Sequence, residues 1–184
     1  MFSIKNVLKD SFLLAMIVFL ATAVDAQDDK SKRKSPPMET TGMVGDVTVA
    51  INYGAPSVNG RVIFGDLEPW DETWRTGANE ATTFSVDKAV KIEGQDLAAG
   101  KYSLFTIPRE DGNWTVIFNS VADQWGDYNY DESKDVLRVD VEAMSSDEIT
   151  EQLRIDLEEE GGASKVVIKW DHTHVPFTIA SGAM

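Results

Sequence analysis

The chain has 184 residues, of which 31 are acidic and 17 basic, so it carries a formal net charge of −14 at pH 7, and it contains no cysteine. The acidic balance argues against a nucleic-acid-binding protein, because neutralising phosphates takes a surplus of lysine and arginine. The absence of cysteine excludes disulfides, thiolate metal sites and attachment of a lipid at a cysteine.

The first segment has the pattern of a secretory signal peptide. Lys5 and Lys9 precede an apolar run over residues 12–24, and small residues stand at the positions before a cleavage site ahead of Gln27. The apolar run is shorter than the ~20 residues that a membrane-spanning helix needs. We therefore expect residues 1–26 to be a signal peptide that is removed on export, with no membrane span in the mature chain.

A short polar segment follows. Residues 27–42 include a basic cluster, "KSKRK" at Lys30–Lys34, and a Ser-Pro-Pro sequence. This composition is typical of a solvated linker, because it offers little apolar surface to bury. We expect a flexible linker over residues 27–42 and a single folded domain over residues 43–181, a length at which a chain can bury a core without disulfides.

From Met43 onward, apolar and polar residues alternate with the period of a half-buried β-strand. In "LRVDVEA", Leu137, Val139 and Val141 face one way and the charged residues face the other. Only Ser145–Gln152 has a helical pattern. We predict an all-β fold, an antiparallel β-sandwich or open barrel with at most one short helix. The alternating segments, two of them flanking a Gly161-Gly162 turn, are residues 47–51, 114–118, 137–141, 153–157, 166–170 and 175–179.

The stretch "WRTGANEATTFSV", residues 74–86, places a carboxylate among the apolar positions of a strand. Alternation puts Glu80 on the same face as Phe84 and Val86, which should face the core. A buried carboxylate without a partner is costly or has a raised pKa. We therefore expect a cation or several hydrogen-bond donors within reach of Glu80.

Arg75 and Arg61 are nearby arginines in the sequence, and a guanidinium can pair with a carboxylate through two parallel hydrogen bonds. Two interpretations follow. The charged residues form either a structural ion pair that pins a strand to a loop, or a polar pocket lined by Glu80, Arg75 and Asn79 at one end of the sandwich.

Tryptophans supply a further functional indication. Trp74 and Trp125 fall at strand ends or in loops, where flat rings beside amides and carboxylates form surfaces for sugars and other small ligands. The alternative is that these rings close the open end of the sandwich. The candidate ligand-binding residues are therefore Trp74, Arg75, Asn79, Glu80, Trp125 and Arg61.

Two segments carry residue types that bind metals in other proteins. "DYNYD" at residues 127–131 begins like a calcium loop but has Glu132 where that loop needs glycine. His172 and His174 have a spacing seen in zinc and copper sites on strands, with only Asp171 as a neighbouring ligand. Metal binding at either segment stays open, neither is taken as a metal site, and no cofactor is expected.

The succession of motifs resembles one family of secreted bacterial domains. The motifs lie between about residues 52 and 179 and read "NYGAPSVNGRVIFG", "EPWDETWRTGANEATTF", "LAAGKYSLFTIP", "WTVIFN", "ADQWGDYNYDESKDVLRV" and "WDHTHVPFTI". They resemble the domain of unknown function 2911. This resemblance implies a single domain exported to the periplasm or surface of a Gram-negative bacterium, with residues 74–82 as its signature block. It implies no activity, catalytic residue or ligand.

Three functions fit these residues. The first is a binding module for a small polar ligand, such as a carbohydrate, a peptide or another cell-envelope component, at the signature block with Trp125 opposite. The second is a hydrolase in which Glu80, with a raised pKa, works beside a second carboxylate such as Asp123 or Asp127. The third is a structural or assembly domain without a ligand. We expect the first: a solvent-accessible Glu80 bonded to Arg75 favours a site, and a sealed pair favours a scaffold.

Overall fold

The computed structural model of the protein describes residues 29–160 and 163–182. The expected signal peptide at 1–26 and the expected turn at Gly161-Gly162 lie outside the described residues. Within them the chain forms two antiparallel sheets and two short 3₁₀-helices, η1 (Lys30–Lys32) and η2 (Glu132–Lys134). No helix in this part of the chain is long and apolar enough to cross a membrane.

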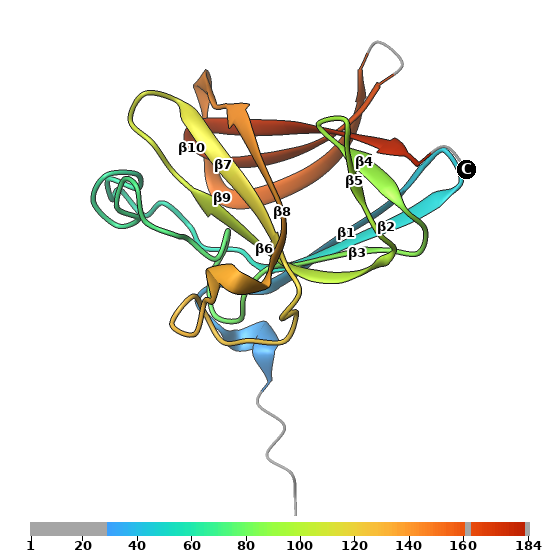
Figure 1. Cartoon of the computed structure of the whole chain (residues 1–184). Coiled ribbons are helices and arrows are strands. Elements are labelled where there is room, and N and C mark those ends of the chain that lie inside the picture. The colour runs from blue at the N-terminus through green and yellow to red at the C-terminus, as the bar shows by residue number, and fades with distance from the viewer. Residues whose placement is uncertain (1–28, 161–162, 183–184) are drawn as a thin grey trace, which may run out of the picture.

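The larger sheet contains β1 (Pro37–Val44), β2 (Val47–Gly54), β3 (Thr83–Val86), β6 (Gly100–Ile107), β7 (Asn113–Asn119) and β8 (Asp135–Glu142). These strands lie in the order β1-β2-β3-β6-β7-β8, and each pairs antiparallel with its neighbours (Figure 1). Two long connections leave this sheet, one between β2 and β3 and one between β7 and β8, and both contribute to the site described below.

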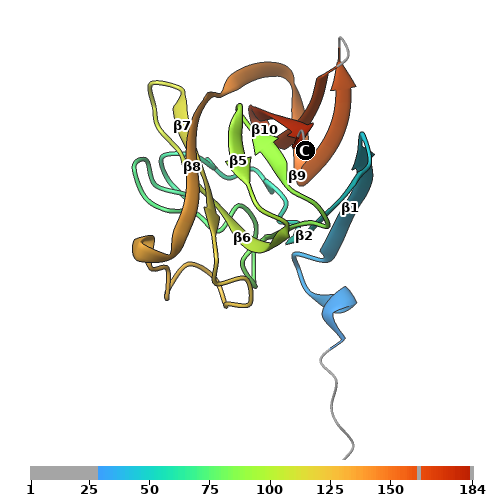
Figure 2. The same cartoon turned by 45° about the vertical axis from the view of Figure 1, so that its right-hand side comes forward.

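The smaller sheet contains β4 (Val90–Ile92), β5 (Gln95–Leu97), β9 (Met144–Glu160) and β10 (Ala163–Ser181), in the order β5-β4-β10-β9. The long strands β9 and β10 form a curved ribbon across the larger sheet (Figures 1 and 2). Asp171 in β10 has a positive φ of 54°, and the register between β9 and β10 shifts on both sides of it. Such an irregularity bends a long strand.

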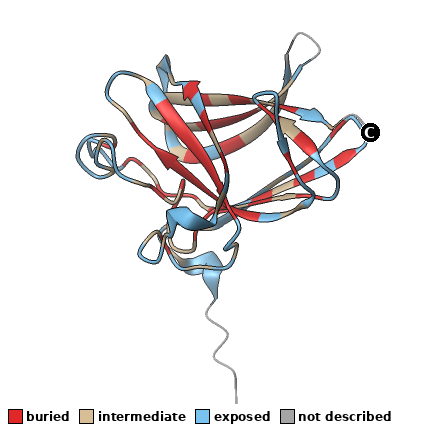
Figure 3. Cartoon of the chain, in the orientation of Figure 1, coloured by how far each residue is buried: buried red, intermediate tan, exposed pale blue. Residues whose placement is uncertain are grey.

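The alternating apolar residues face one another between the two sheets and form the core. In β8, Leu137, Val139 and Val141 are buried, while the residues between them are exposed or half-buried. Phe84 of the larger sheet packs against Phe177 of the smaller one, with ring centroids 6.4 Å apart. The buried residues of both sheets (red in Figure 3) therefore form one main core. The predicted all-β sandwich is confirmed.

The segment expected to be helical is a strand. Residues 145–152 lie within β9, and their backbone pairs with β10 at Ser145↔Thr173 and Thr150↔Asp171. Most side chains at this end of β9 are exposed. A weak local helix pattern is overridden here because a neighbouring strand offers hydrogen bonds, and that pairing depends on tertiary structure.

The folded domain begins before Met43, so the linker expected over residues 27–42 is corrected. β1 begins at Pro37 and pairs with β2 along its whole length. Just before it, the carbonyl of Pro36 accepts a hydrogen bond from the amide of Ala55 (2.9 Å). β1 is an edge strand with mostly exposed side chains, so it lacks the apolar alternation that marks the other strands.

Candidate functional site

The signature block, residues 74–82, is a tight loop that precedes β3. Its backbone turns at Thr76 and Asn79, which have φ angles of 54° and 67°. The buried hydroxyl of Thr82 closes the loop by donating to the carbonyl of Thr76 (2.8 Å). Residues in the left-handed region break the two-residue alternation of a strand. The direction of Glu80 therefore does not follow from the strand that comes after it.

Glu80 does not point into the core, contrary to the expectation from alternation. Its side chain is 43% exposed, and its carboxylate pairs with Lys30 and Arg33, each at 2.8 Å. Partial burial opposes the charge of Glu80, but hydrogen bonds and the nearby cations outweigh this effect and hold its pKa below the ordinary value. The expected pairing with Arg75 or Arg61 is wrong, and so is the raised pKa on which a Glu80 hydrolase depends.

Asn79 and Trp125 lie beside Glu80. The Asn79 amide donates to the carbonyl of Ser35 (3.0 Å), and the backbone of Trp125 bridges to that of Glu80. The Arg33 guanidinium lies 5.8 Å from the centre of the Trp125 ring, a cation–π contact. A groove of about 400 Å³ at this place is lined in part by the same N-terminal segment. These predicted site residues thus bind the protein's own chain.

Trp74 belongs to the core. It is 1% exposed, and its indole N–H donates to the carbonyl of Gly77 within the signature block (3.2 Å). Its ring stacks on Trp170 of β10, with centroids 5.6 Å apart and 19° between the planes. Because the ring is covered, Trp74 shapes the loop and offers no stacking surface to a ligand.

Arg75 and Arg61 meet in a separate pocket of about 420 Å³. It lies among the β2–β3 loop (teal to green in Figure 1), the segment before β1, and β10. Of the six predicted site residues, only these two line it. We call it the arginine pocket and define it by Lys34, Ser57, Arg61, Glu68, Arg75 and Trp170.

Two buried N–H groups of the arginine pocket lack a hydrogen-bond partner in the described part of the chain. They are Arg75 Nε and Trp170 Nε1. The Arg75 side chain is 21% exposed, and Trp170 is 1% exposed. The other end of the Arg75 guanidinium, Nη1, lies 3.9 Å from the carboxylate of Asp127. An unsatisfied buried donor costs about 1–3 kcal/mol, so an acceptor oxygen that reaches either N–H would stabilise the protein.

The arginine pocket also holds a carboxylate that sequence reasoning missed. Glu68 is half-buried, and no described residue donates a hydrogen bond to its carboxylate. Burial raises the pKa of Glu68 to about 7; the charges of Arg75 and Arg61 act against this rise, and the charge of Asp127 adds to it. Glu68 therefore changes its protonation state near neutral pH. Its one sequence signal is its place in the "EPW" of the quoted family motif.

Arg61 is tied to its own turn. Its Nε donates to the carbonyl of Val58 (3.0 Å), and its Nη2 donates to the carbonyl of Ser57 (2.5 Å). These two hydrogen bonds fix the position of the Arg61 charge beside the pocket. Arg61 thus contributes mainly charge, while the free N–H of Arg75 offers a directed hydrogen bond.

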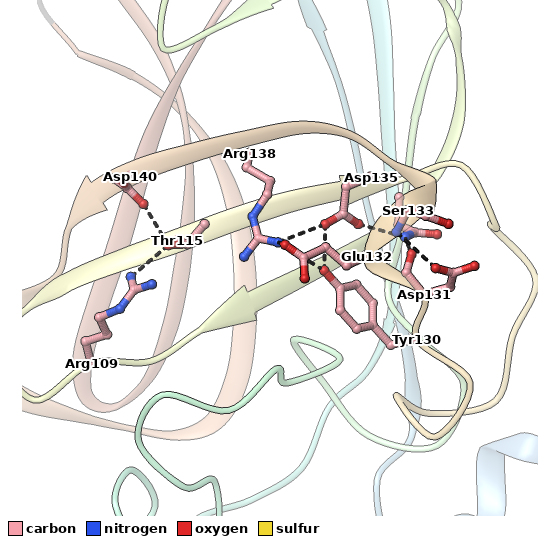
Figure 4. A network of polar contacts seen from close by, with 10 residues as sticks. Arg109, Thr115, Tyr130, Asp131, Glu132, Ser133, Asp135, Arg138 and Asp140 are labelled. Carbon is pink, nitrogen blue, oxygen red and sulfur yellow. Dashed lines mark hydrogen bonds and ion pairs between the residues drawn. The ribbon is translucent and has the colours of Figure 1, made fainter.

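A polar network anchors the loop that carries Asp127, residues 120–134 (Figure 4). The Tyr130 hydroxyl donates to the buried carboxylate of Asp135 (2.6 Å), and Arg138 donates to the same carboxylate (3.2 Å). Burial and the hydrogen bond to Asp135 raise the pKa of Tyr130, so its hydroxyl stays a donor. The loop is thereby fixed at its end, and its Asp127 lies beside Arg75.

Gly126 lets this loop approach Arg75 closely. Its φ is 64°, and a Cβ at this position would lie 2.7 Å from Arg75 Nη1. Glycine adopts this backbone conformation without steric cost, and it leaves the guanidinium in its present position undisturbed. The residue before Asp127 therefore helps to set the geometry of the pocket.

The two segments with metal-binding residue types have other roles. Asp131 caps η2 by accepting a hydrogen bond from the amide of Ser133 (3.0 Å). The ring of His172 hydrogen-bonds with the carbonyl of Ser146 (2.9 Å), and His174 is half-buried. Among residues 29–160 and 163–182, no group of three or more histidine, cysteine or acidic residues is placed to hold a metal ion.

Comparison with known proteins identifies the family. The family model described as Protein of unknown function (DUF2911) matches residues 35–179. Neither the curated proteins nor the solved structures contain a match to the chain. The matched range includes the signature block and the Asp127 loop. It also includes every residue that defines the arginine pocket except Lys34. The resemblance seen in the motifs is thus confirmed, and the chain belongs to the DUF2911 family.

Proposed function

We propose that the protein is an exported binding module for a small polar ligand with an anionic group, which it takes up in the arginine pocket. The observation that carries the proposal is the pair of buried, unpartnered donors, Arg75 Nε and Trp170 Nε1, in a pocket of about 420 Å³. Specific ligand sites are typically concave and hold a few directed polar groups, as this one does.

The pocket chemistry favours an anion over a neutral sugar. The rings of Trp170 and Trp74 are both 1% exposed, so a sugar ring cannot stack on them. Trp125 is exposed, but it lies beside Arg33 and Glu80. The arginine pocket offers N–H donors and positive charge, and these groups suit the oxygens of an anionic group.

Export is part of the proposal and rests on the signal-peptide pattern of residues 1–26. We place the mature protein in the periplasm or on the surface of a Gram-negative cell, where cell-envelope fragments are available as ligands. Protein recovered from outside the cytoplasm should begin at Gln27, which its intact mass would show. An uncleaved chain in the cytoplasm would contradict export.

Thermal unfolding with small acids tests the binding function. A ligand present at ten times its Kd stabilises the folded state by about 1.4 kcal/mol, which raises the Tm by roughly 3–6 °C for a domain of this size. We expect this rise with acetate, glucuronate or N-acetylglycine, and not with neutral glucose. Arg75→Gln should abolish it.

Arg154→Gln is the matched control. Arg154 lies on β9 between the buried residues Leu153 and Ile155, so it points away from the core, and its side chain is 60% exposed. This variant loses the same charge and should keep the full rise in Tm. If none of the acids raises the Tm of the wild type, or if both variants respond as it does, the proposed function is wrong.

A further inference from the structure

The arginine pocket combines donors without acceptors and an acid without a donor. Among the described residues, Arg75 Nε and Trp170 Nε1 have no hydrogen-bond partner, and the carboxylate of Glu68 receives no hydrogen bond. The three residues that carry these groups line the same pocket, but none of the groups is bonded to another. A ligand that completes this site would have to accept hydrogen bonds from the two N–H groups and form a hydrogen bond with the Glu68 carboxyl group.

The charges around Glu68 decide its state when an anion binds. Arg61, Arg75 and Asp127 all act on the Glu68 carboxyl, and Lys34 lines the same pocket. While Glu68 is ionised, an anion beside it meets a like charge. Two carboxylates that share a site do not both ionise readily, and one proton stays between them. A proton on Glu68 therefore replaces repulsion by a hydrogen bond.

We propose that the anionic group of the ligand is a carboxylate, which accepts hydrogen bonds from Arg75 Nε and Trp170 Nε1, and that Glu68 binds it as a neutral acid through its own O–H. This inference rests on the proposed function above and adds the ligand class and a proton. Glu68 takes one proton from solvent as the carboxylate binds and returns it on release. No bond of the ligand is broken.

Proton uptake by Glu68 costs little free energy at neutral pH. Burial already raises the pKa of Glu68 to about 7, so about half of the unliganded molecules hold the proton at that pH. A bound carboxylate shifts this balance further toward the neutral acid, since only the neutral form can donate to it. Binding should therefore be tighter below pH 7 than above it.

A carboxylate fits this donor set better than a dianion. Its two oxygens can accept from the three donors, which are Arg75 Nε, Trp170 Nε1 and the Glu68 hydroxyl. Sulfate would bring twice the charge and more oxygens to a site where Arg75 already faces Asp127. Sulfate is therefore the discriminating probe, because it offers acceptors without being a monovalent planar group.

Indole N–H signals in ¹H–¹⁵N spectra of the exported protein test the inference. The Trp170 signal is identified by its loss in Trp170→Phe. Acetate, glucuronate and sulfate are titrated at pH 5.5 and pH 8.5 at constant ionic strength. We expect both carboxylates to shift the Trp170 signal. Their Kd should be about tenfold lower at pH 5.5 than at pH 8.5, which is the factor that corresponds to a rise of 1 in the pKa of Glu68 on binding. Sulfate should bind more weakly than acetate.

Two variants test whether the pH dependence comes from Glu68 or from another carboxylate. Glu68→Gln keeps a donor but cannot titrate, so its acetate Kd should be the same at both pH values. Glu80→Gln, which changes a carboxylate outside the pocket, should keep the pH dependence. Calorimetry of the wild type in two buffers of different ionisation enthalpy should give an uptake of up to one proton near pH 7.5, without reliance on any variant.

The outcomes distinguish the two proposals. If no probe moves the Trp170 signal at either pH, the binding function is wrong and this inference falls with it. If acetate binds equally well at both pH values and calorimetry finds no proton uptake, only the role of Glu68 is wrong. If sulfate binds more tightly than acetate, the carboxylate class is wrong while the pocket remains an anion site.

Discussion

Glu68 links the stability of the unliganded protein to pH. Burial raises its pKa from 4.5 to about 7 in the folded state, so folding favours the protonated form. The stability from this group is fully present below pH 4.5 and is lost as the pH rises through 7. The loss is on the order of 3–4 kcal/mol, at about 1.4 kcal/mol for each unit of pKa.

We predict that Glu68→Gln is more stable than the wild type above pH 7 by about that amount. The amide resembles the protonated acid, so the difference should close as the pH falls toward 4.5. Urea unfolding of both proteins between pH 4.5 and 8.5 measures it. A constant difference across this range would show that Glu68 titrates as a solvent-exposed acid.

Glu80 has the opposite pH dependence and a smaller effect. Its folded pKa lies below 4.5, so the stability from its pairs with Lys30 and Arg33 is present above pH 4.5 and is lost as the pH falls through the folded value. Because the side chain is 43% exposed, solvent screens these pairs, and we expect Glu80→Gln to cost under about 1 kcal/mol at pH 7.

Denaturant unfolding of Glu80→Gln at low and high salt checks this expectation, and added salt should shrink the cost. Glu39→Gln on the exposed edge strand is the matched control and should leave the stability unchanged. A cost of several kcal/mol for Glu80→Gln, independent of salt, would instead indicate a buried ion pair of the kind expected from strand alternation.

At the scale of elements, the loop between β7 and β8 positions Arg75 through Gly126. We predict that Gly126→Ala destabilises the protein by at least the ~1–2 kcal/mol of left-handed strain, and that the new Cβ displaces Arg75 Nη1, the end of a flexible side chain. It should also weaken acetate binding by displacing the guanidinium. Chemical denaturation and the acetate titration measure the two effects.

Gly94→Ala is the matched control for strain alone. Gly94 has a φ of 77° in the turn between β4 and β5, and a Cβ there would touch nothing within 4 Å. This variant should show the backbone cost and keep normal acetate binding. If Gly126→Ala behaves like Gly94→Ala in both measurements, the close approach to Arg75 is not important.

The sequence predicts elements well where burial sets a regular pattern. β8 follows from its alternation because one face packs in the core. β1 does not, because an edge strand exposes most of its side chains. The prediction of the direction of Glu80 is wrong for another reason. Thr76 and Asn79 adopt left-handed backbone angles without being glycine, and no local sequence pattern predicts this.

Only part of the candidate site could be predicted in the same way. Arg75 and Arg61 can be predicted as candidate site residues because they are charged and lie in or near the signature block. Glu68 gains its raised pKa from burial and from charges on other segments, and Trp170 reaches the pocket from β10. Their roles depend on contacts between segments far apart in the chain, which alternation and spacing do not encode.

At the scale of the whole molecule, the arginine pocket is a property of the assembled domain. Its residues come from the segment before β1, the β2–β3 loop and the last strand. Asp127, whose carboxylate lies 3.9 Å from Arg75 Nη1, comes from the β7–β8 loop. No single hairpin could form it. Ligand binding therefore reports on the complete fold, and a variant that loosens any of these segments should lose affinity before it loses secondary structure.

The net charge of −14 also has a kinetic consequence for the pocket. An anion diffusing toward the protein in dilute buffer feels the repulsion of the whole acidic surface. At physiological ionic strength, fields decay over ~8 Å, and the exposed cations that line the pocket, Lys34 and Arg61, then dominate the approach of the anion. The association rate of a small carboxylate should therefore rise as salt is first added, the reverse of the usual behaviour of electrostatically steered ligands.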